Sequence, residues 1–117
     1  MANERRDYVE RLIEELARVV SDLVARLRVG PPAAAEVTRE VRAAQDQLLG
    51  PLAATLPRVD AASAVALLRD ARRVEAYVSL LRVEAEARRL AGEETGAEEL
   101  AARARALEVA LGAGEGP

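Results

Sequence analysis

Apolar residues recur along this sequence at alternating steps of four and three, a spacing that gathers them into one stripe when the chain is helical. The first such row contains Val9, Ile13, Leu16, Val20, Leu23 and Leu27. It predicts a helix over about residues 4–28. Leu12, Val19 and Val24 widen the stripe. We therefore expect two neighbouring helices to cover this first helix.

Two further rows follow the same spacing, and each predicts another helix. The second row contains Val37, Val41, Ala44 and Leu48, and the third contains Leu67, Ala71, Val74, Val78, Leu81 and Ala85. We expect helices over about residues 33–49 and 60–91. The pairs Gly30-Pro31 and Gly50-Pro51 should end the first two helices, since proline cannot continue a helical hydrogen-bond ladder.

The third region has an alternative organisation. Asp60 is a suitable N-cap residue for it. A single helix of about thirty residues would be about 45 Å long. A break near Arg69 and Asp70, with Asp70 capping a separate helix, is the alternative. Because neither glycine nor proline lies at that point, we favour one continuous helix.

A last helix is expected to carry Leu100, Ala104, Leu107 and Leu111 on one side. Gly92 should end the preceding helix. Thr95 and Glu98 have the spacing of a capping box, in which each side chain satisfies a backbone amide at the helix start. We therefore expect a single helical domain over residues 1–112 and a flexible C-terminal tail over residues 113–117.

The composition favours the same fold class. Tyr8 and Tyr77 are the two aromatic residues, and Phe and Trp are absent. The core must therefore consist of Leu, Val and Ala, and Ala and Leu are strong helix formers. We predict an all-α fold, an antiparallel bundle of four or five helices.

Two stretches resemble known families. The segment from Val74 to Glu108 resembles a tetratricopeptide-type helical hairpin, with Tyr77 in its first helix and small residues at Ala97, Ala101 and Ala104 in its second. The stretch DYVERLIEELARVV, residues 7–20, is similar to the opening of a family of short bacterial helical proteins without an assigned function. Members of that family tend to end in a tetratricopeptide-like hairpin. The resemblance implies an all-helical fold and carries no activity over to this chain. Every basic residue is Arg, which we interpret as a GC-rich, bacterial coding bias.

Most catalytic chemistry is excluded by missing residue types. The chain has no His and no Cys, and every basic residue is Arg. This excludes a Ser-His-Asp triad, a thiol nucleophile, an ordinary zinc site and a Schiff-base lysine. Glu36 and Glu40 share a helix face, but the nearby Arg39 favours a solvated charged surface over a metal site. We predict no enzymatic activity, no metal and no cofactor.

Net charge and hydropathy limit the classes of partner that we expect the chain to bind. The formal net charge is −3, and nucleic-acid-binding proteins usually carry a basic surplus. No apolar run approaches the length of a membrane span, and the charged start does not resemble a signal peptide. We therefore expect a cytoplasmic protein that binds neither nucleic acid nor a membrane.

Four residues are candidates for contact with an anion or a partner. Arg69, Arg72 and Arg73 would lie on one side of a continuous third helix, and Tyr77 follows one turn later. The leading hypothesis is a small, non-catalytic protein–protein interaction or adaptor protein. The alternatives are a structural homo-oligomer that associates through its N-terminal helix, or a binder of an anionic small molecule.

Overall fold

The computed structural model describes residues 2–115, and within that range the chain is helical and contains no strand. The predicted all-α class is therefore confirmed. The five helices are α1 (Ala2–Leu27), α2 (Ala34–Leu49), α3 (Ala61–Leu68), α4 (Ala71–Leu90) and α5 (Glu94–Glu115). Short 3-10 turns at Pro31–Ala33, Gly50–Leu52 and Leu56–Arg58 connect the first three of them.

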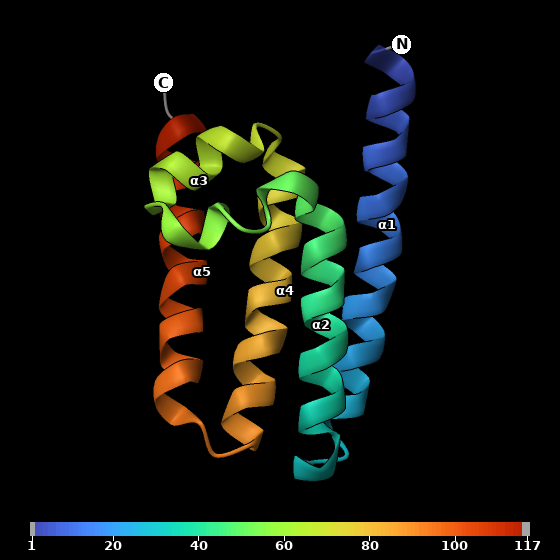
Figure 1. Cartoon of the computed structure of the whole chain (residues 1–117), viewed down its shortest axis with the longest axis vertical. Coiled ribbons are helices and arrows are strands. Elements are labelled where there is room, and N and C mark those ends of the chain that lie inside the picture. Colours follow the sequence, from blue (N-terminus) through green and yellow to red (C-terminus); the bar gives the residue numbers. More distant parts are fainter. Residues whose placement is uncertain (1, 116–117) are drawn as a thin grey trace.

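The four long helices form a bundle in which successive long helices are antiparallel (Figure 1). Helix α4 is central, because it packs against α1, α2, α3 and α5. Helices α1 and α4 run in the same direction, with α2 packed against both of them. The short α3 lies across one end of the bundle and contacts α5.

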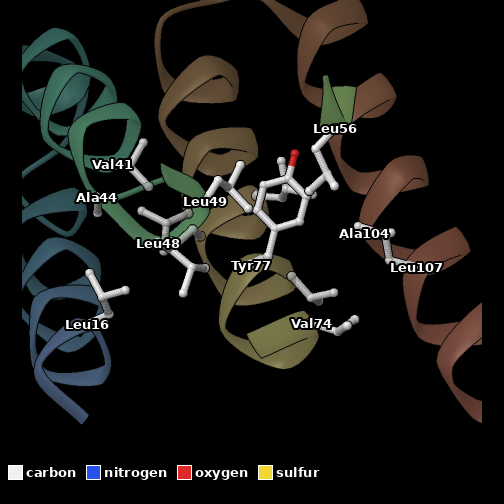
Figure 2. Packing of buried hydrophobic residues seen from close by; sticks show 14 of the residues in the cluster. Leu16, Val41, Ala44, Leu48, Leu49, Leu56, Val74, Tyr77, Ala104 and Leu107 are labelled. Atoms are coloured by element: carbon white, nitrogen blue, oxygen red, sulfur yellow. The ribbon is translucent and has the colours of Figure 1, made fainter. Parts of the chain in front are cut away.

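The core draws on all five helices and consists mostly of leucine, valine and alanine. Figure 2 shows part of it, with Tyr77 of α4 among leucines from α2 and the connector that follows α2. Ala87, Ala97 and Ala104 are completely buried. Their small side chains lie in α4 and α5, and they allow these two helices to approach closely.

The structure corrects the expected continuous helix over residues 60–91. Helix α3 ends at Leu68, and Arg69 has φ 68° and ψ −45°. The amide of Asp70 donates to the carbonyl of Leu68 at 2.8 Å, which closes a γ-turn centred on Arg69. The Asp70 carboxylate then accepts from the amide of Arg72 and caps α4. The alternative of two helices is therefore the correct one.

Two other helix ends bear on the sequence predictions. Asp60 caps α3 as expected, with its carboxylate accepting from the amide of Ser63 at 2.7 Å. Thr95 and Glu98 do not form a capping box, because α5 already begins at Glu94. Helix α5 can begin this early because a compact C-terminal motif, in which Gly92 has φ 84°, ends α4 and turns the chain at once.

The end of the chain also differs from the expected division at residue 112. Helix α5 extends to Glu115, so residues 113–115 are helical. The rest of the expected tail, residues 116–117, lies outside the described residues. Helices α4 and α5 form an antiparallel hairpin, as expected, and its tetratricopeptide-like character stays a prediction.

Candidate functional site

An open groove runs between α1 and α4, on the side of these helices that α2 does not cover. It consists of two adjoining hollows of about 490 Å³ and about 230 Å³. Val20 and Ser79 line both hollows, so the two are continuous. We call this feature the α1–α4 groove; its lining residues are Ile13, Leu16, Ala17, Val20, Val24, Leu27, Arg28, Arg72, Glu75, Ala76, Ser79, Arg82, Val83, Glu86 and Leu90.

The apolar wall of the groove comes from one flank of α1. Leu12, Leu16 and Leu23 point into the core and are buried. Val20 and Val24 lie further round the helix and line the groove, and 41% of Val24 is exposed. As expected, two helices, α2 and α4, pack against α1. They cover only part of its broad stripe, and the flank that lines the groove stays open.

The opposite rim of the groove is a polar row on α4. Its members are Arg72, Glu75, Ser79, Arg82 and Glu86, all of them exposed. Their spacing of three and four residues keeps the row on one face of the helix. The groove therefore combines an apolar wall on α1 with a row of alternating charges on α4.

Some charges in this row already have partners within the chain. Arg82 donates to Glu108 of α5, with one of the two contacts at 3.1 Å. This pairing holds the pKa of the Glu108 carboxyl below its ordinary value. Arg72 lies 4.0 Å from Glu10 of α1, across the end of the groove. These exposed ion pairs are weak, so the side chains stay available to other partners.

The three arginines that the sequence brought together have different surroundings. Arg69 occupies the γ-turn between α3 and α4. Arg72 lines the α1–α4 groove. Arg73 donates to the carbonyl oxygens of Leu48 and Leu49, at 2.9 and 3.2 Å, at the C-terminus of α2. The expectation that they share one helix side is wrong, because Arg69 lies in the turn before α4, and Arg72 and Arg73, adjacent on α4, point about 100° apart.

Tyr77, the fourth candidate, belongs to the core. Its residue surface is 3% exposed, and it lies among Leu48, Leu49 and Leu56 in Figure 2. Burial raises the pKa of its hydroxyl above the ordinary value. The side chain therefore packs the interior and does not form part of the groove wall.

A buried carboxylate joins α2 to α4. Glu84 is only 3% exposed, and it accepts from Gln45 at 2.9 Å and from Arg42 and Arg88 at 3.3 Å each. A buried carboxylate needs hydrogen-bond donors to offset its loss of water, and these side chains supply them. Because Arg42 and Gln45 lie on α2 and Glu84 lies on α4, the cluster connects the two helices.

A second charged cluster joins α1 to α2. Arg26 donates to Asp22 at 2.8 Å, to Glu36 at 2.9 Å and to Glu40. The bonds to Glu40 and Asp22 raise the pKa of the Arg26 guanidinium. Glu36 and Glu40, the acidic pair considered as a metal site, therefore face a cation. In the part of the chain that the structure describes, no group of three or more acidic residues could hold a metal ion.

Comparison with known proteins returned no relative: no family model, curated protein or solved structure matches the chain. The resemblance of residues 7–20 to a family of bacterial helical proteins therefore stays a prediction. Within residues 2–115, every helix is too short or too polar to cross a membrane.

Proposed function

We propose that this chain is a small, non-catalytic interaction protein that binds a helix of a protein partner in the α1–α4 groove. The observation that carries the proposal is the row of partly buried and exposed apolar residues Ile13, Ala17, Val20 and Val24 along an open groove. An amphipathic helix can lay its own apolar face into such a groove, with anchors one helical turn apart.

The residue types of the chain support a role without catalysis. It contains neither His nor Cys, so it lacks the side chains that most often serve as general bases and nucleophiles near neutral pH. The buried carboxylate of Glu84 already accepts hydrogen bonds from three side chains of the protein itself. The α1–α4 groove is lined mainly by aliphatic side chains and ion-paired residues, which suits packing of another helix.

Three finer features belong to the same proposal. The α4–α5 hairpin is of the tetratricopeptide-like type, as the small residues at Ala97 and Ala104 suggest. The protein is bacterial and cytoplasmic, which fits the exclusive use of arginine and the absence of cysteine. Its partners are proteins and do not include nucleic acid or membranes, in keeping with a net charge of −3.

The experiment uses one substitution in the groove and a matched one outside it. Val24→Glu places a charge on the apolar wall, whereas Val109→Glu makes the same change at a residue of α5 that is 72% exposed. Both variants and the natural protein are cross-linked in the cells that produce it, and the attached proteins are identified by mass spectrometry.

We expect Val24→Glu to lose the partners that Val109→Glu retains, because a charge cannot be buried in an apolar contact without a partner. Circular dichroism checks that both variants keep the helical content of the natural protein. If the two variants capture the same proteins in the same amounts, the groove is not the binding surface and the proposal is wrong.

A further inference from the structure

The polar row on α4 has a charge pattern that is complementary to itself in reverse. Along the helix, Arg72, Glu75, Ser79, Arg82 and Glu86 carry charges of plus, minus, zero, plus and minus. When two copies of this row face each other in opposite directions around Ser79, every charge meets its opposite. Arg72 then faces the partner's Glu86, and Glu75 faces the partner's Arg82.

The groove-facing row of α1 has the same property. It begins with Glu10, which lies 4.0 Å from Arg72 at the end of the groove. It continues through Ile13, Ala17, Val20 and Val24 and ends with Arg28, all of which line the groove. Reversal around the midpoint between Ala17 and Val20 places Ile13 opposite the partner's Val24. It also places Glu10 close to the partner's Arg28. Apolar residues therefore meet apolar residues in the middle, and opposite charges meet at both ends.

One symmetry axis can reverse both rows together. Helices α1 and α4 run in the same direction, and Val20 and Ser79 line both hollows, at the middle of the groove. A two-fold axis that lies across the groove at this level turns α1 onto the partner's α1 and α4 onto the partner's α4. Two-fold contacts of this kind are the commonest in protein oligomers, because one surface is complementary to itself.

We infer that the α1–α4 groove is half of the core of a homodimer, in which the second copy of this chain packs antiparallel. This inference rests on the proposed function and names its partner. The two grooves close on each other to form a four-helix core from α1 and α4 of both chains. Val20, Val24, Val83 and Leu90, which line the larger hollow, supply its interior.

A copy turned the other way around fits less well. With the two-fold axis parallel to the helices, α1 would lie against the partner's α4. The apolar residues Val20 and Val24 would then face Ser79 and the charged Arg82 of the polar row. Burying that charge against an apolar wall is unfavourable. The antiparallel copy avoids this mismatch, so the structure favours it.

The size of the face predicts a reversible dimer. The row from Glu10 to Arg28 is about 27 Å long, and two adjacent helices are about 20 Å wide, which gives a face of about 500 Å². Stable interfaces bury about 800 Å² on each partner. The dimer should therefore form at high protein concentration and dissociate on dilution.

The decisive experiment uses charge reversal followed by mixing. Glu75→Arg places two positive charges opposite each other at both ends of the symmetric contact, and Arg82→Glu places two negative charges there. Each variant alone should dimerise at least about tenfold more weakly than the natural protein. Mixed together, the two variants should form a heterodimer, because every contact between them then joins opposite charges.

Mass in solution is measured by light scattering and sedimentation between about 5 and about 500 µM, a range that covers weak association. A dimer mass for the natural protein and for the mixture, with monomers for each variant alone, supports the inference. A monomer at every concentration overturns it. A mixture that dimerises no better than the separate variants also overturns it, since the antiparallel pairing requires this rescue.

Failure of this inference is distinguishable from failure of the proposed function. Val24→Glu should abolish the dimer and Val109→Glu should preserve it. A natural protein that stays monomeric, yet loses cross-linked partners in Val24→Glu, uses the groove for a different protein. In that case the homodimer is wrong while groove binding stands.

Discussion

Replacing Arg69 by glycine tests the turn that separates α3 from α4. Arg69 has φ 68° and ψ −45°, a conformation in which the Cβ atom of an L-residue crowds the backbone. Holding a residue other than glycine in such a conformation costs about 1–3 kcal/mol. Glycine removes this cost, because it has no Cβ.

The expected gain is worked out by comparing two substitutions at this site. Arg69→Gly and Arg69→Ala both remove the exposed guanidinium, so their difference isolates the backbone. Glycine loses about 0.5–1 kcal/mol more conformational freedom than alanine on folding. Subtracting this from the relieved strain leaves Arg69→Gly more stable than Arg69→Ala by about 1 kcal/mol, the middle of a range of about 0–2.5 kcal/mol. For a domain of this size, about 1 kcal/mol raises the melting temperature by about 4 °C.

Ala66→Gly provides the matched control, since Ala66 is an exposed residue within α3. There glycine should be less stable than the natural alanine by about 1 kcal/mol. Thermal and urea unfolding followed by circular dichroism measure all three variants. If Arg69→Ala proves at least as stable as Arg69→Gly, the γ-turn is absent and one continuous helix, as the sequence favoured, is correct.

Three more predictions concern the core, the buried carboxylate and the response to acid. Leu80→Ala should lower the free energy of unfolding by about 2–5 kcal/mol, because Leu80 is fully buried. Leu67 is half-exposed, so Leu67→Ala should lower it by less than about 1 kcal/mol. Equal losses of stability in urea unfolding would contradict this packing. Glu84→Ala should lower the free energy of unfolding by about 1–3 kcal/mol, because the Gln45 amide and the Arg42 guanidinium lose their acceptor. An unchanged urea midpoint would argue against the connection between α2 and α4. The pKa of Asp60 lies below its ordinary value because its carboxylate accepts from the amide of Ser63. A lowered carboxyl pKa stabilises the fold above the ordinary pKa of about 4, and this contribution is lost as pH falls through the lower folded-state value. Asp60→Asn should therefore show a weaker loss of stability between about pH 5 and about pH 2, and a loss as steep as that of the natural protein would contradict the cap.

The helices themselves were readable from the sequence because their apolar spacing is regular. The expected helix over residues 4–28 corresponds to α1, and the expected 33–49 corresponds to α2. Gly-Pro pairs marked the ends of these two helices, and Asp60 marked the start of α3. Each of these signals is local, so it acts in the same way whatever the rest of the chain does.

The break at Arg69 was considered as the alternative but not favoured, because no local signal of the usual kind marks it. Glycine or proline would have indicated a turn, and arginine does not. The apolar spacing also continues across the break, from Leu67 to Ala71 and Val74, so it looks like one helix. Asp70 was the signal present, and its carboxylate does cap α4. Tertiary packing of α3 across the bundle end overrides the local preference for a longer helix.

The break accounts for only one of the three candidate arginines, because it removes Arg69 from α4. Arg72 and Arg73 both lie on α4, but adjacent residues of a helix point about 100° apart. Arg73 therefore lies beside the last carbonyls of α2, and Arg72 lies beside α1. The sequence analysis therefore named one residue of the groove, Arg72, but expected it in a contact with Arg69 and Arg73.

The groove itself had a signal in the width of the α1 stripe. Leu16 and Leu23 are buried, and Val24 is left 41% exposed. Within the described chain, the other helices lie elsewhere: α2 packs on the covered side of α1 and α4, and α3 and α5 pack together beyond α4. This arrangement leaves the flank of α1 that lines the groove open. The reversed charges of α4 are the reason we infer that a second copy of the same groove covers it.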